Sequence, residues 1–126
     1  MENGKHVILV IDDDADVRYA LRVVLEGNGY TVCEAPTAEE GLKAYKQHKP
    51  DLLIVDLMME EVDAGVLFVK ELKALANTAP IYMLSSVGDN LNMSTDYAEL
   101  GLDGVFQKPI DNKVLLSILS AKLKRK

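Results

Sequence analysis

The residues of this sequence best suited to chemistry are an aspartate pair and a third aspartate that each follow an apolar run. Asp12 and Asp13 come directly after Val7–Ile11, and Asp56 comes directly after Leu52–Val55. Carboxylates that crowd together repel one another unless a cation neutralises them. A hard divalent cation such as Mg²⁺ binds oxygen ligands octahedrally and keeps several waters. If the fold brings these aspartates together, they can hold such a cation.

A hydroxyl and an ammonium group stand at equivalent places further along the chain. Ser85 follows the apolar run Ile81–Leu84, and Lys108 follows Gly104–Gln107. Beside a bound cation, a carboxylate can attack a phosphoryl phosphorus as a nucleophile. A hydroxyl and an ammonium group can then each hold a phosphoryl oxygen. Taken singly, Ser85 is more typical of a turn residue and Lys108 of a surface lysine.

The elements that must position these residues alternate between strands and helices. Apolar runs of this length are typical of strands buried on both faces of a parallel sheet. The second strand is more polar than the others, so we expect it at a sheet edge. The predicted strands are Val7–Ile11, Tyr30–Glu34, Leu52–Val55, Ile81–Leu84 and Gly104–Gln107.

Helices are predicted between the strands, because apolar residues recur there at helical spacing. We expect Asp14 to cap the first helix and Thr37, with Glu40 three residues on, to cap the second. A helix is also expected over about Val66–Leu75, a short one around Asn92–Leu100, and a last one over about Asn112–Lys124. The predicted inward-facing residues are Val17, Ala20, Leu21, Val24, Leu25, Ala38, Gly41, Leu42, Tyr45, Phe68, Leu72, Leu75, Leu115, Ile118 and Leu119.

Five strand–helix units predict an α/β fold of the flavodoxin-like, doubly wound (βα)5 type. This is a three-layer sandwich with a parallel sheet in the order 2-1-3-4-5. In that order strands one, three and four are neighbours, and open α/β sheets bind ligands at the carboxyl ends of their strands. Independent surface residues need not all follow strands at one edge. The order therefore gathers five side chains into one crevice: Asp12, Asp13, Asp56, Ser85 and Lys108.

Composition excludes several other classes of protein. The 126 residues suit a single domain over 1–126, with a core of about residues 6–124. The net charge of −6 argues against a nucleic-acid-binding surface. The single Cys33 cannot form an internal disulfide, which suits a cytoplasmic protein. No apolar run approaches the ~20 residues that span a bilayer, and the N-terminus has no signal-peptide pattern, so we expect no membrane association.

At these residues the chain resembles the receiver domains of two-component response regulators. The similarity runs from Val7 to about Leu123. It rests on four motifs in order: Ile-Asp-Asp at 11–13, Pro-Asp-Leu-Leu-Ile-Val-Asp-Leu-Met-Met at 50–59, Leu-Ser-Ser at 84–86 and Lys-Pro at 108–109. The resemblance implies a bacterial-type signalling module rather than a turnover enzyme. Such a module catalyses only its own phosphorylation and dephosphorylation.

The resemblance also implies a role for each residue of the crevice. Asp56 matches the aspartate that accepts a phosphoryl group from a sensor histidine kinase or a histidine phosphotransfer protein. The metal is Mg²⁺ or Mn²⁺, and an output protein, or an output domain outside this sequence, reads the switched surface. The implied metal ligands are Asp12, Asp13, Asp56 and the backbone carbonyl of Met58, with Ser85 as the switch hydroxyl and Lys108 as the phosphoryl contact.

The sequence departs from the family pattern at several positions. Val105 stands where the family has a switch aromatic, and Phe106, one residue later, is expected on the opposite face of the strand. The loop Glu60–Gly65 is one residue longer than usual and begins with glutamate where the family has proline. Met58 and Val87 cannot orient an attacking water, which predicts slow loss of the phosphoryl group.

Three other functions would place different demands on the sequence than a receiver does. A phosphatase of the haloacid dehalogenase type needs a second acid two residues after its nucleophile, where this chain has Met58. A flavodoxin-type flavin carrier needs a phosphate-binding loop after the first strand, where this chain has three aspartates. A receiver that has lost phosphorylation and serves only for docking would not need the full set of five site residues.

Overall fold

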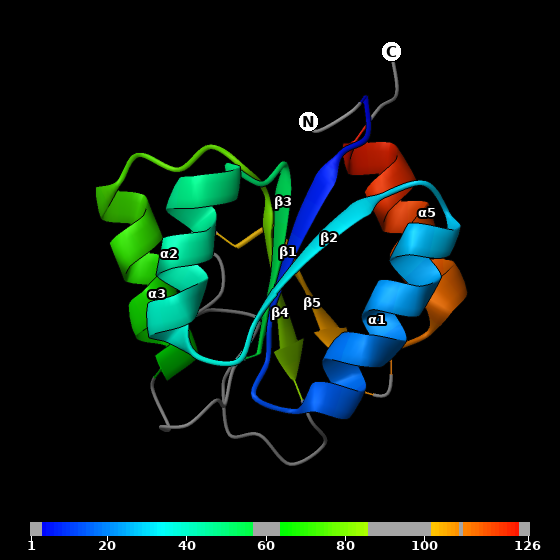
Figure 1. Ribbon diagram of the computed structural model, residues 1–126, viewed down its shortest axis with the longest axis horizontal. Helices are drawn as coiled ribbons and strands as arrows, with labels where there is room; N and C mark the ends of the chain where they lie inside the picture. Colours follow the sequence, from blue (N-terminus) through cyan, green and yellow to red (C-terminus); the bar gives the residue numbers. More distant parts are fainter. Residues whose placement is uncertain (1–3, 57–63, 86–101, 109, 124–126) are drawn as a thin grey trace.

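The computed structural model describes residues 4–56, 64–85, 102–108 and 110–123. Five strands form one parallel sheet in the order β2-β1-β3-β4-β5, as predicted (Figure 1). The strands are β1 (Val7–Ile11), β2 (Thr31–Ala35), β3 (Leu52–Asp56), β4 (Ile81–Ser85) and β5 (Gly104–Gln107). The helices of the described part are α1 (Ala15–Gly27), α2 (Ala38–His48), α3 (Ala64–Ala74) and α5 (Asn112–Lys122).

Helices cover both faces of the sheet and make the three layers expected. In Figure 1, α1 and α5 lie on one side of the sheet and α2 and α3 on the other. Successive residues of a strand point to opposite faces, so β1 sends Ile8 and Val10 into the core under α1 and α5. Leu9 and Ile11 enter the second core, on the α2 and α3 side. Because β1 is buried on both faces along its whole length, its unbroken apolar run is explained.

Strand β2 lies at the sheet edge, as its polarity predicted, but begins at Thr31 rather than Tyr30. The reason is the end of α1. Gly29 has φ +89°, and its N–H bonds to the Glu26 carbonyl while the Tyr30 N–H bonds to the Leu25 carbonyl. This Schellman arrangement uses the Tyr30 N–H to satisfy the last turn of the helix. The strand therefore starts one residue later.

Two predicted inward residues are wrong, and three helix ends differ. Ala20 is exposed, because the covered stripe of α1 centres on Leu21 and Leu25. Leu75 is 45% exposed, because α3 ends at Ala74 and the chain turns away through Ala76, whose φ is +59°. Helix α3 begins at 64 rather than 66, and α5 ends at 122 rather than 124.

Several predicted features lie outside the described residues. They are the Met58 carbonyl, the loop residues 60–63, Val87 and the short helix around 92–100. The predicted slow loss of the phosphoryl group, which depends on Met58 and Val87, therefore stays a prediction. Among the helices that are described, none is long and apolar enough to cross a membrane.

Candidate functional site

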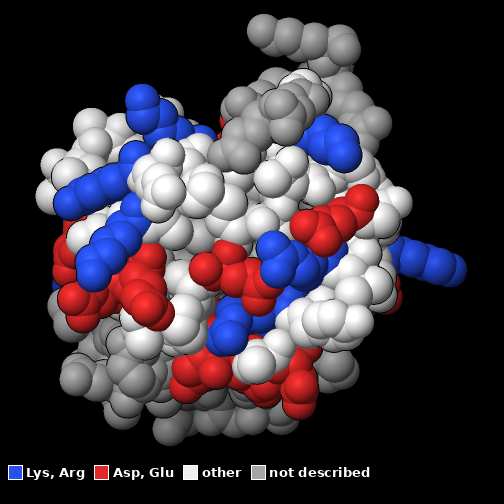
Figure 2. All heavy atoms as spheres, viewed as in Figure 1, with Lys and Arg blue, Asp and Glu red and all other residues white. Residues whose placement is uncertain are grey.

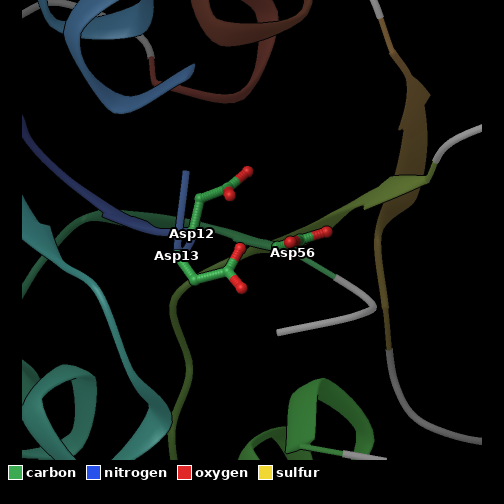
Figure 3. Close-up of side chains that lie close together, drawn as sticks. All are labelled: Asp12, Asp13 and Asp56. Atoms are coloured by element: carbon green, nitrogen blue, oxygen red, sulfur yellow. The ribbon is translucent and has the colours of Figure 1, made fainter. Parts of the chain in front are cut away.

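Two adjacent strands bring the three aspartates together. The ladder between β1 and β3 pairs Ile11 with Val55, so Asp12, just after β1, and Asp56, the last residue of β3, lie side by side at the carboxyl end of the sheet. Carboxylate oxygens of Asp12, Asp13 and Asp56 lie within 4.8 Å of one another. Figure 3 shows the three side chains gathered at the end of β1 and β3. The convergence expected from the sequence is confirmed for this set.

The first aspartate is buried and held at several atoms. Asp12 has no exposed surface. Its N–H donates to the Ala35 carbonyl at 3.1 Å, and its Oδ1 accepts from the Asp14 N–H at 2.9 Å. Asp14 in turn is the N-cap of α1, and its side chain accepts from the Asp16 N–H. The helix thus begins directly beside the site, and the expected capping role of Asp14 is confirmed.

Lys108 reaches two of the carboxylates from the end of β5. Its Nζ lies 3.0 Å from Asp12 Oδ2 and 3.3 Å from Asp56 Oδ1. Burial alone would lower the pKa of Lys108, but the Asp12 carboxylate and, after it, the Asp56 carboxylate raise that pKa above its ordinary value. Lys108 is therefore a firmly charged ammonium group that faces the acidic cluster.

The fourth strand places the hydroxyl at the same edge. Ser85 is the last residue of β4 and is buried. Its carbonyl accepts a hydrogen bond from the Lys108 N–H at 2.7 Å, and the β3–β4 register pairs Asp56 with Leu84, the residue before it. The fold thus puts Ser85 next to both the third aspartate and the lysine.

The donor set fits a hard divalent cation. Among the described residues, three carboxylates gather in this crevice, and the Lys108 ammonium group pairs with two of them. Within the described part of the chain, Asp12 Oδ2 is a buried oxygen without a hydrogen bond, since the contact with Lys108 is close but not oriented as one. Buried carboxylate oxygens require a cation or a donor. Mg²⁺ and Mn²⁺ prefer oxygen ligands of this kind, so the residues present fit such an ion.

The residues that depart from the family pattern at β5 lie as the strand alternation predicted. Phe106 is buried in the core on the α1 and α5 side and stacks on Tyr82, with ring centroids 5.2 Å apart. Val105 packs against the core on the α2 and α3 side. The aromatic ring of β5 is thus committed to the core, on the face opposite the switch position.

One residue at the site was missed from the sequence. Arg18, one turn into α1, donates from Nη1 to the Asp12 carbonyl at 2.6 Å. Nothing in its local pattern marks it, because an arginine on an amphipathic helix is usually a solvated side chain. Its only signal is its place, one helical turn after the capping aspartate and thus near the turn that carries the acidic pair.

A parallel sheet in this order, with helices on both faces and an acidic cluster at the carboxyl ends of β1 and β3, defines a flavodoxin-like α/β protein of the CheY-like class. The chain belongs to the response regulator receiver domain family, whose profile matches residues 8–120. It is a signalling module of two-component systems.

Individual relatives agree with this assignment. The chain is 33% identical to the chemotaxis protein CheY of Bacillus subtilis over 94% of this chain and 98% of that protein. It is 33% identical to the transcriptional regulatory protein CseB of Streptomyces avermitilis, over 99% of this chain and 52% of CseB, so it spans about half the length of that regulator. A crystal structure of a putative response regulator from Chloroflexus aurantiacus superimposes with a TM-score of 0.81 at 34% identity, over 96% of this chain and 99% of that one.

Proposed function

We propose that Asp56 is the phosphoacceptor of this receiver domain. The observation that supports it most directly is the place of the Asp56 carboxylate. It stands at the end of a buried strand, among carboxylate oxygens within 4.8 Å and 3.3 Å from the Lys108 ammonium group. A carboxylate oxygen of Asp56 attacks the phosphorus of a phosphohistidine. The P–O bond to Asp56 forms, the P–N bond breaks, and the leaving imidazole takes up a proton.

The other residues of the site neutralise and orient the phosphoryl group. Asp12, Asp13 and Asp56, together with the Met58 carbonyl, would hold Mg²⁺ or Mn²⁺, and the ion would supply positive charge that neutralises the phosphoryl group. Lys108 contributes a second positive charge from the β5 side, and the Ser85 hydroxyl binds a phosphoryl oxygen from β4. Positioning and charge neutralisation are most of what phosphoryl transfer requires.

We also propose the wider setting of this chemistry from the family to which the chain belongs. The whole chain, residues 1–126, acts as one receiver domain in the cytoplasm. Its phosphoryl donor is a sensor histidine kinase or a histidine phosphotransfer protein. Its output is a protein, or a domain outside this sequence, that reads the phosphorylated surface. Neither a nucleic acid nor a membrane is bound by this domain.

The test is phosphorylation by a small donor. The protein is incubated with acetyl phosphate and Mg²⁺, and its intact mass is measured. We expect a gain of one phosphoryl group that disappears in Asp56→Asn and in the presence of EDTA. Asp51→Asn is the matched control, because Asp51 lies at the opposite end of the same strand and should leave the mass gain intact. An unchanged mass under conditions that label another receiver would contradict the proposal and favour a docking role.

A further inference from the structure

The turn that carries Asp12 and Asp13 is fixed at its backbone as well as at its side chains. The Asp12 N–H is held by the Ala35 carbonyl of β2, and the Asp12 carbonyl is held by the Arg18 guanidinium at 2.6 Å. The peptide group is planar, so fixing that carbonyl also fixes the N–H side of Asp13. The orientation of this peptide therefore sets the direction in which the Asp13 side chain leaves the backbone.

Arg18 itself is held by an anchor on the neighbouring strand. Its Nε donates to Glu34 Oε1 at 3.2 Å, and only 17% of the Arg18 side chain and 22% of the Glu34 side chain are exposed. The other oxygen of the anchor, Glu34 Oε2, lies 2.6 Å from Nη1 of Arg22. Figure 2 looks onto this α1–β2 face, where basic and acidic side chains alternate across the centre of the view. A guanidinium is a rigid fork of donors, so an anchor at Nε sets the direction of Nη1.

Beyond Glu34, the guanidinium groups of Arg18 and Arg22 contact different parts of the fold. Arg22 Nη2 lies 3.4 Å from the Val32 carbonyl, in the middle of β2, and its side chain is 43% exposed. Arg18 instead ends on the carbonyl of a residue whose own carboxylate belongs to the site. The pair therefore offers one arginine that touches the acidic turn and one, a helical turn away, that does not.

We infer that Arg18, anchored by Glu34, is a positioning residue for the divalent cation site, because it fixes the Asp12–Asp13 peptide from which two ligands project. This inference rests on the proposed function, since it assumes that the acidic cluster holds a metal. Groups that orient metal ligands typically change metal affinity by about 10–100-fold when they are removed.

The charge of Arg18 allows a positioning role to be distinguished from a simple electrostatic effect. A cation near a divalent metal repels it, so removal of Arg18 should strengthen metal binding if charge alone decides. If positioning decides, removal of Arg18 should weaken binding. The two accounts predict opposite signs for the same substitution.

The experiment measures Mn²⁺ binding without any phosphoryl donor, from the electron paramagnetic resonance signal of free Mn²⁺, on the full chain at a temperature where all variants are folded. We expect Arg18→Ala to raise the Kd for Mn²⁺ by about 10-fold. Arg22→Ala, the matched control, should change the Kd much less than Arg18→Ala, because Arg22 shares the Glu34 anchor but its other contacts, with Glu26 and the Val32 carbonyl, lie away from the acidic turn. Arg18→Lys keeps the charge but cannot reproduce the fork of donors. We expect its Kd to lie between those of the parent protein and Arg18→Ala.

The outcomes separate this inference from the proposed function. An Arg18→Ala protein that binds Mn²⁺ as tightly as the parent, or more tightly, would overturn the positioning role even if it is less stable. Should that variant fail to fold, Arg18→Lys decides, and parental affinity in it overturns the role. If acetyl phosphate fails to label the parent protein while Mn²⁺ binding still depends on Arg18, the phosphoacceptor function fails and the positioning role stands.

Discussion

Aspartates at the two ends of the parallel sheet have opposite surroundings. At the amino end, Asp51 precedes β3 and its Oδ2 accepts the Val7 N–H of β1 at 2.7 Å. Asp103 precedes β5, and its Oδ2 accepts the Ile81 N–H of β4 at 3.0 Å. Each of these carboxylates therefore caps the first residue of the neighbouring strand.

At the carboxyl end the strands present carbonyl groups instead of N–H groups. Asp12 and Asp56 lie close together there, and both pair with Lys108. The buried Asp12 Oδ2 has no hydrogen bond in the described part of the chain. The polarity of a parallel sheet thus separates carboxylates that complete the fold from carboxylates that require a cation, although the residue type is the same.

The largest difference between the two ends should appear in metal binding. Asp12→Ala removes a ligand from the acidic cluster, and we expect the Kd for Mn²⁺ to rise by at least about 100-fold, since even the loss of a group that only orients a ligand costs about 10–100-fold. Asp51→Ala should leave that Kd within about twofold. Titration of both variants with Mn²⁺ would measure this. Equal losses in the two would show that the ends do not differ in function.

The next difference should appear in stability, where the aspartates at the amino end of the sheet should matter more. Asp51→Ala leaves the N–H of fully buried Val7 without its side-chain acceptor. We expect the free energy of unfolding to fall by about 1–3 kcal/mol, measured by urea denaturation in EDTA. Asp103→Ala serves as a second amino-end variant and should also lower stability, because it removes the acceptor of the Ile81 N–H. A stability unchanged in both variants would remove the capping role.

The sequence predicted which residues come together at one edge of the sheet, because the sheet topology alone places them there. Residues that directly follow parallel strands must emerge at one edge, so the ends of β1, β3, β4 and β5 sufficed to bring Asp12, Asp56, Ser85 and Lys108 together. The strand order itself followed from five alternating units of ordinary length. By the same reasoning Asp51, which precedes β3, lies at the opposite edge.

What the sequence could not predict depends on contacts between elements or on single turns. The Arg18 contact with the Asp12 carbonyl needs the anchor on β2, which no spacing along the chain reveals. Leu75 fits the helical period of α3, but the helix stops one residue before it. The period of a pattern does not say where a helix ends, because that is decided by local turn geometry such as the positive φ of Ala76.

A smaller difference between the two ends of the sheet should appear in the pH dependence of stability. Lys108 has a pKa raised above its ordinary value in the folded protein, since the acidic carboxylates outweigh its burial. A raised folded pKa means that its contribution to stability is fully present below the unfolded pKa of 10.5 and is lost as pH rises through the folded pKa.

We therefore expect Lys108→Gln to be less stable than the parent by about 1 kcal/mol at pH 8 in EDTA. The difference should shrink once the pH exceeds 10.5. Urea denaturation of both proteins from pH 8 upward measures it. Lys122→Gln is the amino-end control, because Lys122 pairs with Asp103 at 3.6 Å on a more exposed surface. A gap between parent and Lys108→Gln that stays constant with pH would contradict the assignment.

The smallest expected effect concerns Asp13. Here the change in Tm should have opposite signs at the two ends of the sheet. Asp13 is exposed, but its carboxylate faces two others within 4.8 Å. Like charges at this distance destabilise the metal-free fold, so Asp13→Asn should raise the Tm in EDTA by about 2 °C. The same change at the amino end, Asp103→Asn, should lower the Tm, because the amide can still accept the Ile81 N–H but loses the charge that pairs with Lys122.

Added Mn²⁺ should then reverse the order of thermal stability, so that the parent protein becomes more stable than Asp13→Asn. A ligand that binds only the folded state stabilises it more when it binds more tightly, and the parent protein keeps a carboxylate that Asp13→Asn has lost. Thermal denaturation with EDTA and with saturating Mn²⁺ would show the crossing. If Asp13→Asn is less stable than the parent under both conditions, repulsion does not govern the carboxyl end, and the distinction between the two ends would rest on hydrogen bonding alone.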